Sequence, residues 1–235
     1  MTSYKELKQE AYAANMEIPA RSLAIYTWGN VSAFDPNAGV FAIKPSGVAY
    51  DELTPDFMVV VDLEGKTVEG NLKPSSDTKT HLVLYRSFAK YGLRGIVHTH
   101  SPYAVAWAQS RCDIPVFGTT HADHLTVPIP CTNYLSEQEL NGDYELATGE
   151  MIVQTFEERN LNPAEVQMVL LAGHGPFTWG ANASKAVYNA AVLEEVSKMA
   201  LATVQISGWT NTLPDYITRK HWERKHGKDA YYGQS

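Results

Sequence analysis

The stretch Gly95-Ile96-Val97-His98-Thr99-His100 predicts a short buried strand that leads into a pair of histidines. Side chains alternate between the two faces of a strand, so residues two positions apart lie on the same face. We therefore expect the imidazoles of His98 and His100 to point at one spot.

A third histidine and an aspartate can complete a metal site with this pair. His174 follows an apolar run over residues 166–171 and stands between two glycines, which lets the backbone approach closely. Asp77 is one of the helix-capping side chains that precede an amphipathic segment. Three imidazoles and a carboxylate suit zinc first, and manganese or cobalt also fit. A lone strand histidine is more often a core residue, but the combination favours a catalytic divalent metal.

Composition limits the class of protein. The 235 residues are 44% hydrophobic, and no change in composition or repeat divides residues 1–235 into more than one domain. No apolar run approaches the roughly 20 residues that span a bilayer, so we expect no membrane partner. The net charge of −7 disfavours nucleic acid as a partner. The amino terminus lacks the features of a secretory signal, and the two cysteines, Cys112 and Cys131, are too few for a disulfide framework, so we expect a cytoplasmic protein.

Periodicity and turn residues predict helices and two early hairpins, with turns at residues 35–39 and 64–66. Helices are expected over residues 7–16, 77–90, 102–109 and from Asn182 or Ser184 to about 204, with a helical turn at 136–139. Strands are expected at 40–43, 57–62, 67–69 and 114–117, and strand or mixed segments at 149–160 and 166–172. These elements predict a layered α/β domain with a largely antiparallel sheet.

Two turn segments can hold a phosphate group. Lys44-Pro45-Ser46-Gly47 places a cation, a hydroxyl and a glycine at a turn, and Ser75 and Ser76 stand at a helix start, where free N–H groups attract anions. Each segment alone is more often ordinary turn or cap chemistry. The second runs directly into Asp77, which favours a shared function. Gly29-Asn30 can add an amide and a backbone donor, or form only a solvated turn.

Two further segments carry groups that can exchange protons or contact a partner. The loop over residues 118–123 contains His121 and Asp123, although such loop residues are usually only solvated. The segment over residues 221–233 is rich in charge and aromatic side chains. It can dock on a neighbouring subunit, or form an exposed charged helix.

The ordered set of motifs resembles the class II aldolase and adducin-head family over essentially the whole chain. The motifs are Trp28-Gly29-Asn30-Val31-Ser32, Lys44-Pro45-Ser46-Gly47, Lys73-Pro74-Ser75-Ser76-Asp77, His98-Thr99-His100, Gly118-Thr119-Thr120-His121-Ala122-Asp123, His174-Gly175-Pro176 and Tyr231-Tyr232-Gly233-Gln234. The resemblance implies a three-layer α/β/α subunit with a central, largely antiparallel sheet. It also implies a ring-shaped homotetramer with active sites at subunit boundaries.

The same resemblance implies roles for individual residues. The metal ligands are matched by His98, His100, His174 and Asp77, and the substrate and phosphate pocket by Gly29, Asn30, Ser46, Gly47, Ser75 and Ser76, with Lys44 close by. Asp123 and Tyr232 match an acid/base pair, with the tyrosine reaching in from an adjacent subunit. His221 and Arg224 fall where the family has functional tail residues.

The implied reaction is the interconversion of L-ribulose 5-phosphate and D-xylulose 5-phosphate during pentose breakdown, for example of arabinose. Related sugar-phosphate aldolases carry a glutamate base at the position of Asp77, so the aspartate favours inversion over cleavage. Two alternatives stay open at this point. One is an aldolase or dehydratase that releases a product from another sugar phosphate, and the other is a non-catalytic, adducin-like assembly module.

Overall fold

A computed structural model describes residues 4–228, 230 and 231 and contains one antiparallel sheet within that part of the chain. The strands are β1 (Asn30–Asp35), β2 (Val40–Ile43), β3 (Val59–Asp62), β4 (Thr67–Glu69), β5 (Gly95–His98), β6 (Met168–Leu171) and β7 (Gly175–Gly180). Their order across the sheet is β4-β3-β2-β1-β5-β7-β6. The expected antiparallel sheet is confirmed, and β5 lies inside it between β1 and β7.

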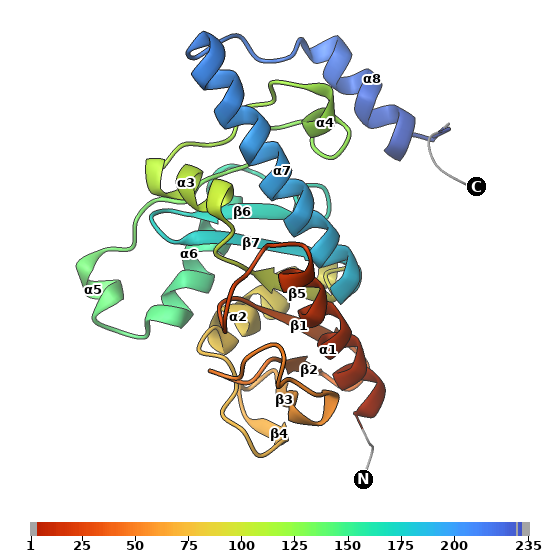
Figure 1. The fold of residues 1–235 in the computed structure, drawn as a ribbon, viewed down its shortest axis with the longest axis vertical. Helices are drawn as coiled ribbons and strands as arrows, with labels where there is room; N and C mark the ends of the chain where they lie inside the picture. Colours follow the sequence, from red (N-terminus) through yellow and green to blue (C-terminus); the bar gives the residue numbers. More distant parts are fainter. Residues whose placement is uncertain (1–3, 229, 232–235) are drawn as a thin grey trace.

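Helices cover both faces of the sheet (Figure 1). They are α1 (Lys5–Ala20), α2 (Thr78–Phe88), α3 (Pro102–Ser110), α4 (Thr119–Ala122), α5 (Glu137–Leu140), α6 (Tyr144–Glu158), α7 (Ala183–Ser207) and α8 (Asp215–His226), with 3-10 turns η1 (Pro55–Phe57) and η2 (Ala89–Tyr91). Among the described residues, none of these helices is both long and apolar enough to cross a membrane.

Strand alternation divides the core between the two faces. Ile96 packs in one cluster of buried side chains with Tyr85 of α2 and Ile152 of α6. Its neighbour Val97 packs in a second cluster with Ala11 of α1, and α7 supplies further alanines to the same cluster. Successive residues of β5 therefore face opposite helical layers, which confirms the expected three-layer α/β/α arrangement.

Several local predictions are confirmed where short-range signals are strong. The two early hairpins form, and α1 extends the predicted first helix at both ends. Ser136 and Glu139 form a complete capping box at the start of α5. Asn182, one of two candidate caps for α7, accepts a hydrogen bond from the Lys185 backbone N–H at 2.7 Å.

Other local predictions are wrong. Residues 149–160 belong largely to α6, where Ile152 and Phe156 are buried one turn apart. Gly149 is tolerated in this helix because it touches α2: a Cβ atom there would lie 2.7 Å from the Val83 Cβ. Residues 114–117 form only an isolated bridge between Ile114 and Ile129, since Pro115 lacks the N–H group that a ladder needs.

Candidate metal centre and active site

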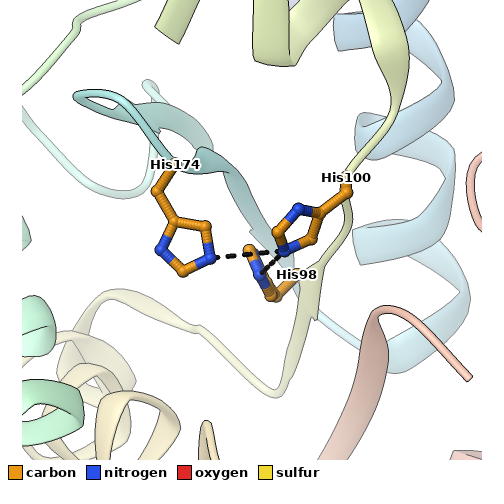
Figure 2. A group of neighbouring side chains, drawn as sticks. All are labelled: His98, His100 and His174. Atoms are coloured by element: carbon orange, nitrogen blue, oxygen red, sulfur yellow. Dashed lines mark hydrogen bonds between the residues drawn. The ribbon is translucent and has the colours of Figure 1, made fainter. Parts of the chain in front are cut away.

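Three histidines meet at one end of the central strands (Figure 2). The Nε2 atom of His100 lies 3.1 Å from His98 Nε2 and 3.3 Å from His174 Nε2. Zinc holds imidazole nitrogens at about 2.0–2.1 Å in a tetrahedral arrangement, which places them roughly 3.3–3.4 Å apart. Two of the three donor separations match this spacing, and all three donor atoms lie within 4.8 Å of one another, close enough for the three rings to hold one divalent cation.

Neighbouring strands and close backbone contacts position these side chains. His98 ends β5 and pairs with Asn30 on β1 and Phe177 on β7. His100 lies two residues beyond the strand, so only His98 stands on the regular ladder. His174 occupies the turn between β6 and β7.

Glycines bring the backbone close to the strand end. A Cβ atom at Gly29, where φ is +75°, would lie 2.8 Å from the His98 carbonyl oxygen. A Cβ atom at Gly175 would lie 2.8 Å from the Thr99 carbonyl oxygen. The two glycines thus allow close approach on both sides of the residues that carry the metal-binding imidazoles.

Hydrogen bonds and stacking fix the orientation of the His98 ring. Its Nδ1 atom lies 3.0 Å from the Pro176 carbonyl oxygen. A carbonyl oxygen only accepts, so Nδ1 carries the proton and the Nε2 lone pair faces His100. The ring also stacks on Phe177, with ring centroids 4.3 Å apart. This tautomer and orientation are those that a metal ligand requires.

Burial favours the neutral, metal-binding form of the other two imidazoles. Desolvation lowers the pKa of His174 to about 4, and the neighbouring His98 and His100 act in the same direction. Desolvation also lowers the pKa of His100. Both rings are therefore neutral near pH 7, as coordination demands.

Asp77 lies on the wall of the same cavity, although it does not belong to the compact three-histidine group. Its carboxylate accepts a hydrogen bond from the Asn30 amide instead of capping α2 as expected. Burial acts to raise the pKa of Asp77, but nearby His98, His81 and the Asn30 hydrogen bond outweigh it and lower that pKa. The carboxylate is thus ionised at neutral pH.

An open cavity of about 520 Å³ joins the histidines to the predicted pocket residues. Its lining includes Gly29, Asn30, Lys44, Ser46, Gly47, Ser75, Ser76, Asp77, His98, His100 and His174, and also Thr27, Trp28, Pro45, Tyr144 and Glu145. Backbone hydrogen bonds hold the two turn segments together, from Ser46 N to Lys73 O at 2.9 Å and from Ser75 N to Lys44 O at 3.0 Å. Segments that are distant in sequence therefore form one wall.

Lys44 is the cation of this wall. The residue is 2% exposed, and its Nζ atom lies 3.4 Å from the Thr27 carbonyl oxygen and 4.9 Å from the centre of the Tyr50 ring. Burial lowers the pKa of this lysine. An anion in the cavity would provide the charged partner that these neutral contacts do not supply.

Tyr144 and Glu145 are the cavity residues that sequence reasoning missed. They begin α6, and their position against His174 depends on how α6 packs, which no local pattern reports. The Tyr144 hydroxyl lies 2.8 Å from His174 Nδ1. Both ring nitrogens of His174 therefore have a partner: Nδ1 contacts Tyr144, and Nε2 faces His100.

Asp123 does not line the cavity. Its carboxylate accepts hydrogen bonds from Arg224 Nη2 at 2.7 Å and from His221 Nδ1 at 3.0 Å, where α4 packs against α8 (Figure 1). Partial burial opposes ionisation, but Arg224, His221 and Lys225 lower the pKa of Asp123 to about 2. The expected acid/base partner Tyr232 lies outside the described residues.

The chain resembles known proteins in both sequence and structure. The sequence model of the Class II Aldolase and Adducin N-terminal domain matches residues 9–201. The chain is 51% identical over 230 residues to the L-ribulose-5-phosphate 4-epimerase UlaF of Salmonella paratyphi C (strain RKS4594), covering 98% of this chain and 99% of the relative.

Solved structures share the fold. An L-fuculose 1-phosphate aldolase has a TM-score of 0.78 at 25% identity, with 95% of this chain and 97% of the aldolase aligned. YgbL from Klebsiella pneumoniae, described as a putative aldolase/epimerase/decarboxylase, has a TM-score of 0.72 at 23% identity, covering 94% of this chain and 99% of that one. The second likeness concerns the fold alone.

Proposed function

Because the chain belongs to the Class II Aldolase and Adducin N-terminal domain family, we propose that it interconverts L-ribulose 5-phosphate and D-xylulose 5-phosphate. The observation that carries the proposal is the three-histidine group opening onto the same cavity as the two joined turn segments. The chain is 51% identical to a relative named as an L-ribulose-5-phosphate 4-epimerase, and this identity supports epimerisation at C4 over the other reactions of the family.

Inversion at C4 requires breaking a carbon–carbon bond. The carbonyl of the pentulose is C2, so it does not acidify the C4 hydrogen. Removal of the C4 hydroxyl proton instead allows the C3–C4 bond to break, with its electron pair passing to C3 and the carbonyl. The fragments are a dihydroxyacetone enediolate and glycolaldehyde phosphate. Rotation of the aldehyde, renewed C3–C4 bond formation and protonation of the new C4 alkoxide give the epimer.

We propose that His98, His100, His174 and Asp77 hold a divalent cation, with zinc the first choice for this donor set. When bound, it would supply Lewis-acid stabilisation of the negative charge that develops on cleavage. Asp77 is already oriented by the amide of Asn30, which lines the same cavity.

The joined turn segments are proposed to retain the aldehyde fragment while it rotates. Lys44 provides charge, and Ser46, Ser75 and Ser76 provide hydroxyl donors on the same wall, with Gly47 leaving space for the phosphate group. Holding the phosphate at one end leaves the aldehyde carbon free to turn at the other. Escape of this fragment would convert epimerisation into net cleavage.

We assign the proton transfers to Asp123 and Tyr232, and propose that both residues reach a given site from an adjacent subunit of a homotetramer. Asp123 is ionised, which is the form that can accept a proton, and because it lies apart from its own cavity we place this role in a neighbour's site. His221 and Arg224, which hold Asp123, would reach the neighbouring substrate with it. The indole of Trp28 is 51% exposed beside His100 at the cavity, where a second subunit can cover it.

A cytoplasmic location forms part of the proposal. Both cysteines are free, Cys131 being buried and Cys112 partly buried, and free thiols are usual in a reducing compartment. A place in pentose catabolism follows from the proposed substrate.

The direct test of the reaction is NMR of purified protein with L-ribulose 5-phosphate, with and without added zinc and with a chelator. D-xylulose 5-phosphate is expected to accumulate with zinc, and formation is expected to stop after exhaustive chelation. Accumulation of glycolaldehyde phosphate without any epimer would identify an aldolase instead. Full activity after complete removal of metal would contradict the proposed chemistry.

Replacing Lys44 with methionine is expected to raise the KM for the phosphorylated substrate by about ten- to hundred-fold, because a charge-assisted contact to phosphate is lost. Methionine keeps the apolar packing of the buried stem. The measurement is initial rate against substrate concentration, with inorganic phosphate as a competing ligand.

The matched control for Lys44→Met is Lys90→Met, which removes an exposed lysine outside the cavity and is expected to leave KM unchanged. If Lys44→Met retained the original KM and its inhibition by phosphate, Lys44 would not be a phosphate ligand.

A further inference from the structure

We propose that Tyr144 is a positioning residue for the metal centre: its hydroxyl accepts the Nδ1 proton of His174 and holds that ring in the tautomer whose Nε2 can coordinate. The inference rests on the proposed function, since it concerns the metal on which that reaction depends.

The geometry of Tyr144 and His174 is that of a metal-ligating imidazole hydrogen-bonded to a supporting side chain. The Tyr144 hydroxyl lies 2.8 Å from His174 Nδ1, while Nε2 on the other side of the ring lies 3.3 Å from His100 Nε2. The two aromatic rings are also nearly parallel, with an interplanar angle of 17°. The hydrogen bond therefore fixes which nitrogen of the imidazole faces the other ligands.

The direction of the hydrogen bond follows from the need for a free Nε2 lone pair. With Nε2 coordinating, Nδ1 carries the proton and the Tyr144 oxygen must accept it. The phenol proton then needs another acceptor, and Thr148 lies one turn further along α6. Its Oγ1 atom is buried and has no hydrogen-bond partner among the described residues, so it is available as that acceptor.

The start of α6 is anchored firmly enough for this task. Asp143, the residue before Tyr144, caps the helix by accepting from Leu146 N and forms an ion pair with Lys79 of α2. Thr80 of α2 donates a hydrogen bond to the Glu145 carbonyl oxygen at 2.7 Å. Residues on both sides of Tyr144 thus contact α2, one through its side chain and one through its backbone carbonyl, which keeps the start of α6 beside His174.

The three-histidine group therefore contains two kinds of support. His98 is held by a backbone carbonyl, that of Pro176, which no substitution of a side chain removes. His174 is held by the Tyr144 hydroxyl, and replacing Tyr144 with phenylalanine removes only that oxygen atom. The contribution of support at His174 can consequently be measured by a single conservative substitution.

Tyr144→Phe is expected to weaken zinc binding by about ten- to hundred-fold in a competition titration of the full-length protein against a chromophoric chelator. The matched control is Tyr188→Phe, which removes another tyrosine–histidine hydrogen bond, 2.9 Å long to His124, outside the cavity. It is expected to bind zinc as tightly as the unmodified chain. The metal-free melting temperatures of both variants are expected to remain close to the original.

A second measurement reports the tautomer itself. Nitrogen-15 NMR of metal-free protein is expected to show His174 protonated on Nδ1 in the unmodified chain and in Tyr188→Phe, and a mixture of neutral tautomers in Tyr144→Phe. A general loss of packing would not produce that change while preserving the melting temperature. Unchanged tautomer and unchanged zinc affinity in Tyr144→Phe would overturn the inference.

The outcomes separate this inference from the proposed function. If the unmodified protein binds zinc and forms D-xylulose 5-phosphate while Tyr144→Phe binds zinc equally well, only the positioning role of Tyr144 fails. If the unmodified protein takes up no divalent metal, the proposed function and this inference both fail.

Discussion

Replacing His100 with alanine is expected to abolish tight binding of a divalent metal and to slow epimerisation by at least about a thousand-fold. One of the three imidazoles is lost, and Lewis-acid stabilisation worth about 4 kcal/mol corresponds to a factor of about a thousand in rate. His100 is exposed in the open cavity, so its removal leaves the packed core in place. The loss of activity is therefore expected without a loss of folding.

The measurements for His100→Ala are metal content by elemental analysis, turnover by NMR and the melting temperature of the metal-free protein. His98→Ala is expected to lose metal as well, but also some stability, because His98 is buried against Phe177. His124→Ala serves as the control for metal content, since His124 lies outside the cavity. Retention of metal and full turnover in His100→Ala would dismiss the proposed centre.

Mixing two inactive chains is expected to restore activity if Asp123 serves a neighbouring site. Asp123→Asn alone is expected to slow turnover by about a hundred- to ten-thousand-fold, the range for loss of a general acid or base. Co-refolding it with His100→Ala creates some boundaries at which an intact cavity meets an intact Asp123. With random assembly, roughly a quarter of the boundaries are of this kind, so about a quarter of the activity should return.

The complementation experiment has an internal control in each variant refolded alone, which must remain inactive at equal protein concentration. Native mass spectrometry with one isotopically labelled chain establishes the oligomeric state and shows that mixed oligomers have formed. Mixed oligomers without recovered activity would mean that Asp123 does not act across a subunit boundary.

The fold was predictable where hydrogen bonding and burial are local. The turn residues at 35–39 predict the hairpin of β1 and β2, and the side chain of Asn182 predicts the start of α7. Strand β7 was missed because Gly175-Pro176 resembles a turn, and its strand character depends on pairing with β5 and β6 on either side. The α6 helix was misassigned because Gly149 weakens its signal while serving its contact with α2.

The residues of the candidate site also fall into those that could be predicted from the sequence and those that could not. His98, His100 and His174 could be identified as metal-binding candidates from residue type and flanking glycines, and the cavity does bring them together. Tyr144 could not be identified, because its value lies in a contact with a residue 30 positions away. Asp77 was expected to cap a helix, yet its carboxylate accepts a hydrogen bond from Asn30 on the cavity wall, an interaction set by the packing of segments that are distant in the sequence.

The proposed metal-binding histidines and Asp123 lie in parts of the molecule that differ in how readily they open. His98 belongs to β5, which has a partner strand on each side, whereas Asp123 is held by α8, a helix whose buried residue among those described is Thr218. Strands inside a sheet are generally among the last regions of a protein to open, and helices with few buried contacts are among the first. If the proposed roles are correct, gentle warming would therefore release Asp123 before the three histidines separate, and the protein would lose turnover while keeping its metal and recover on cooling.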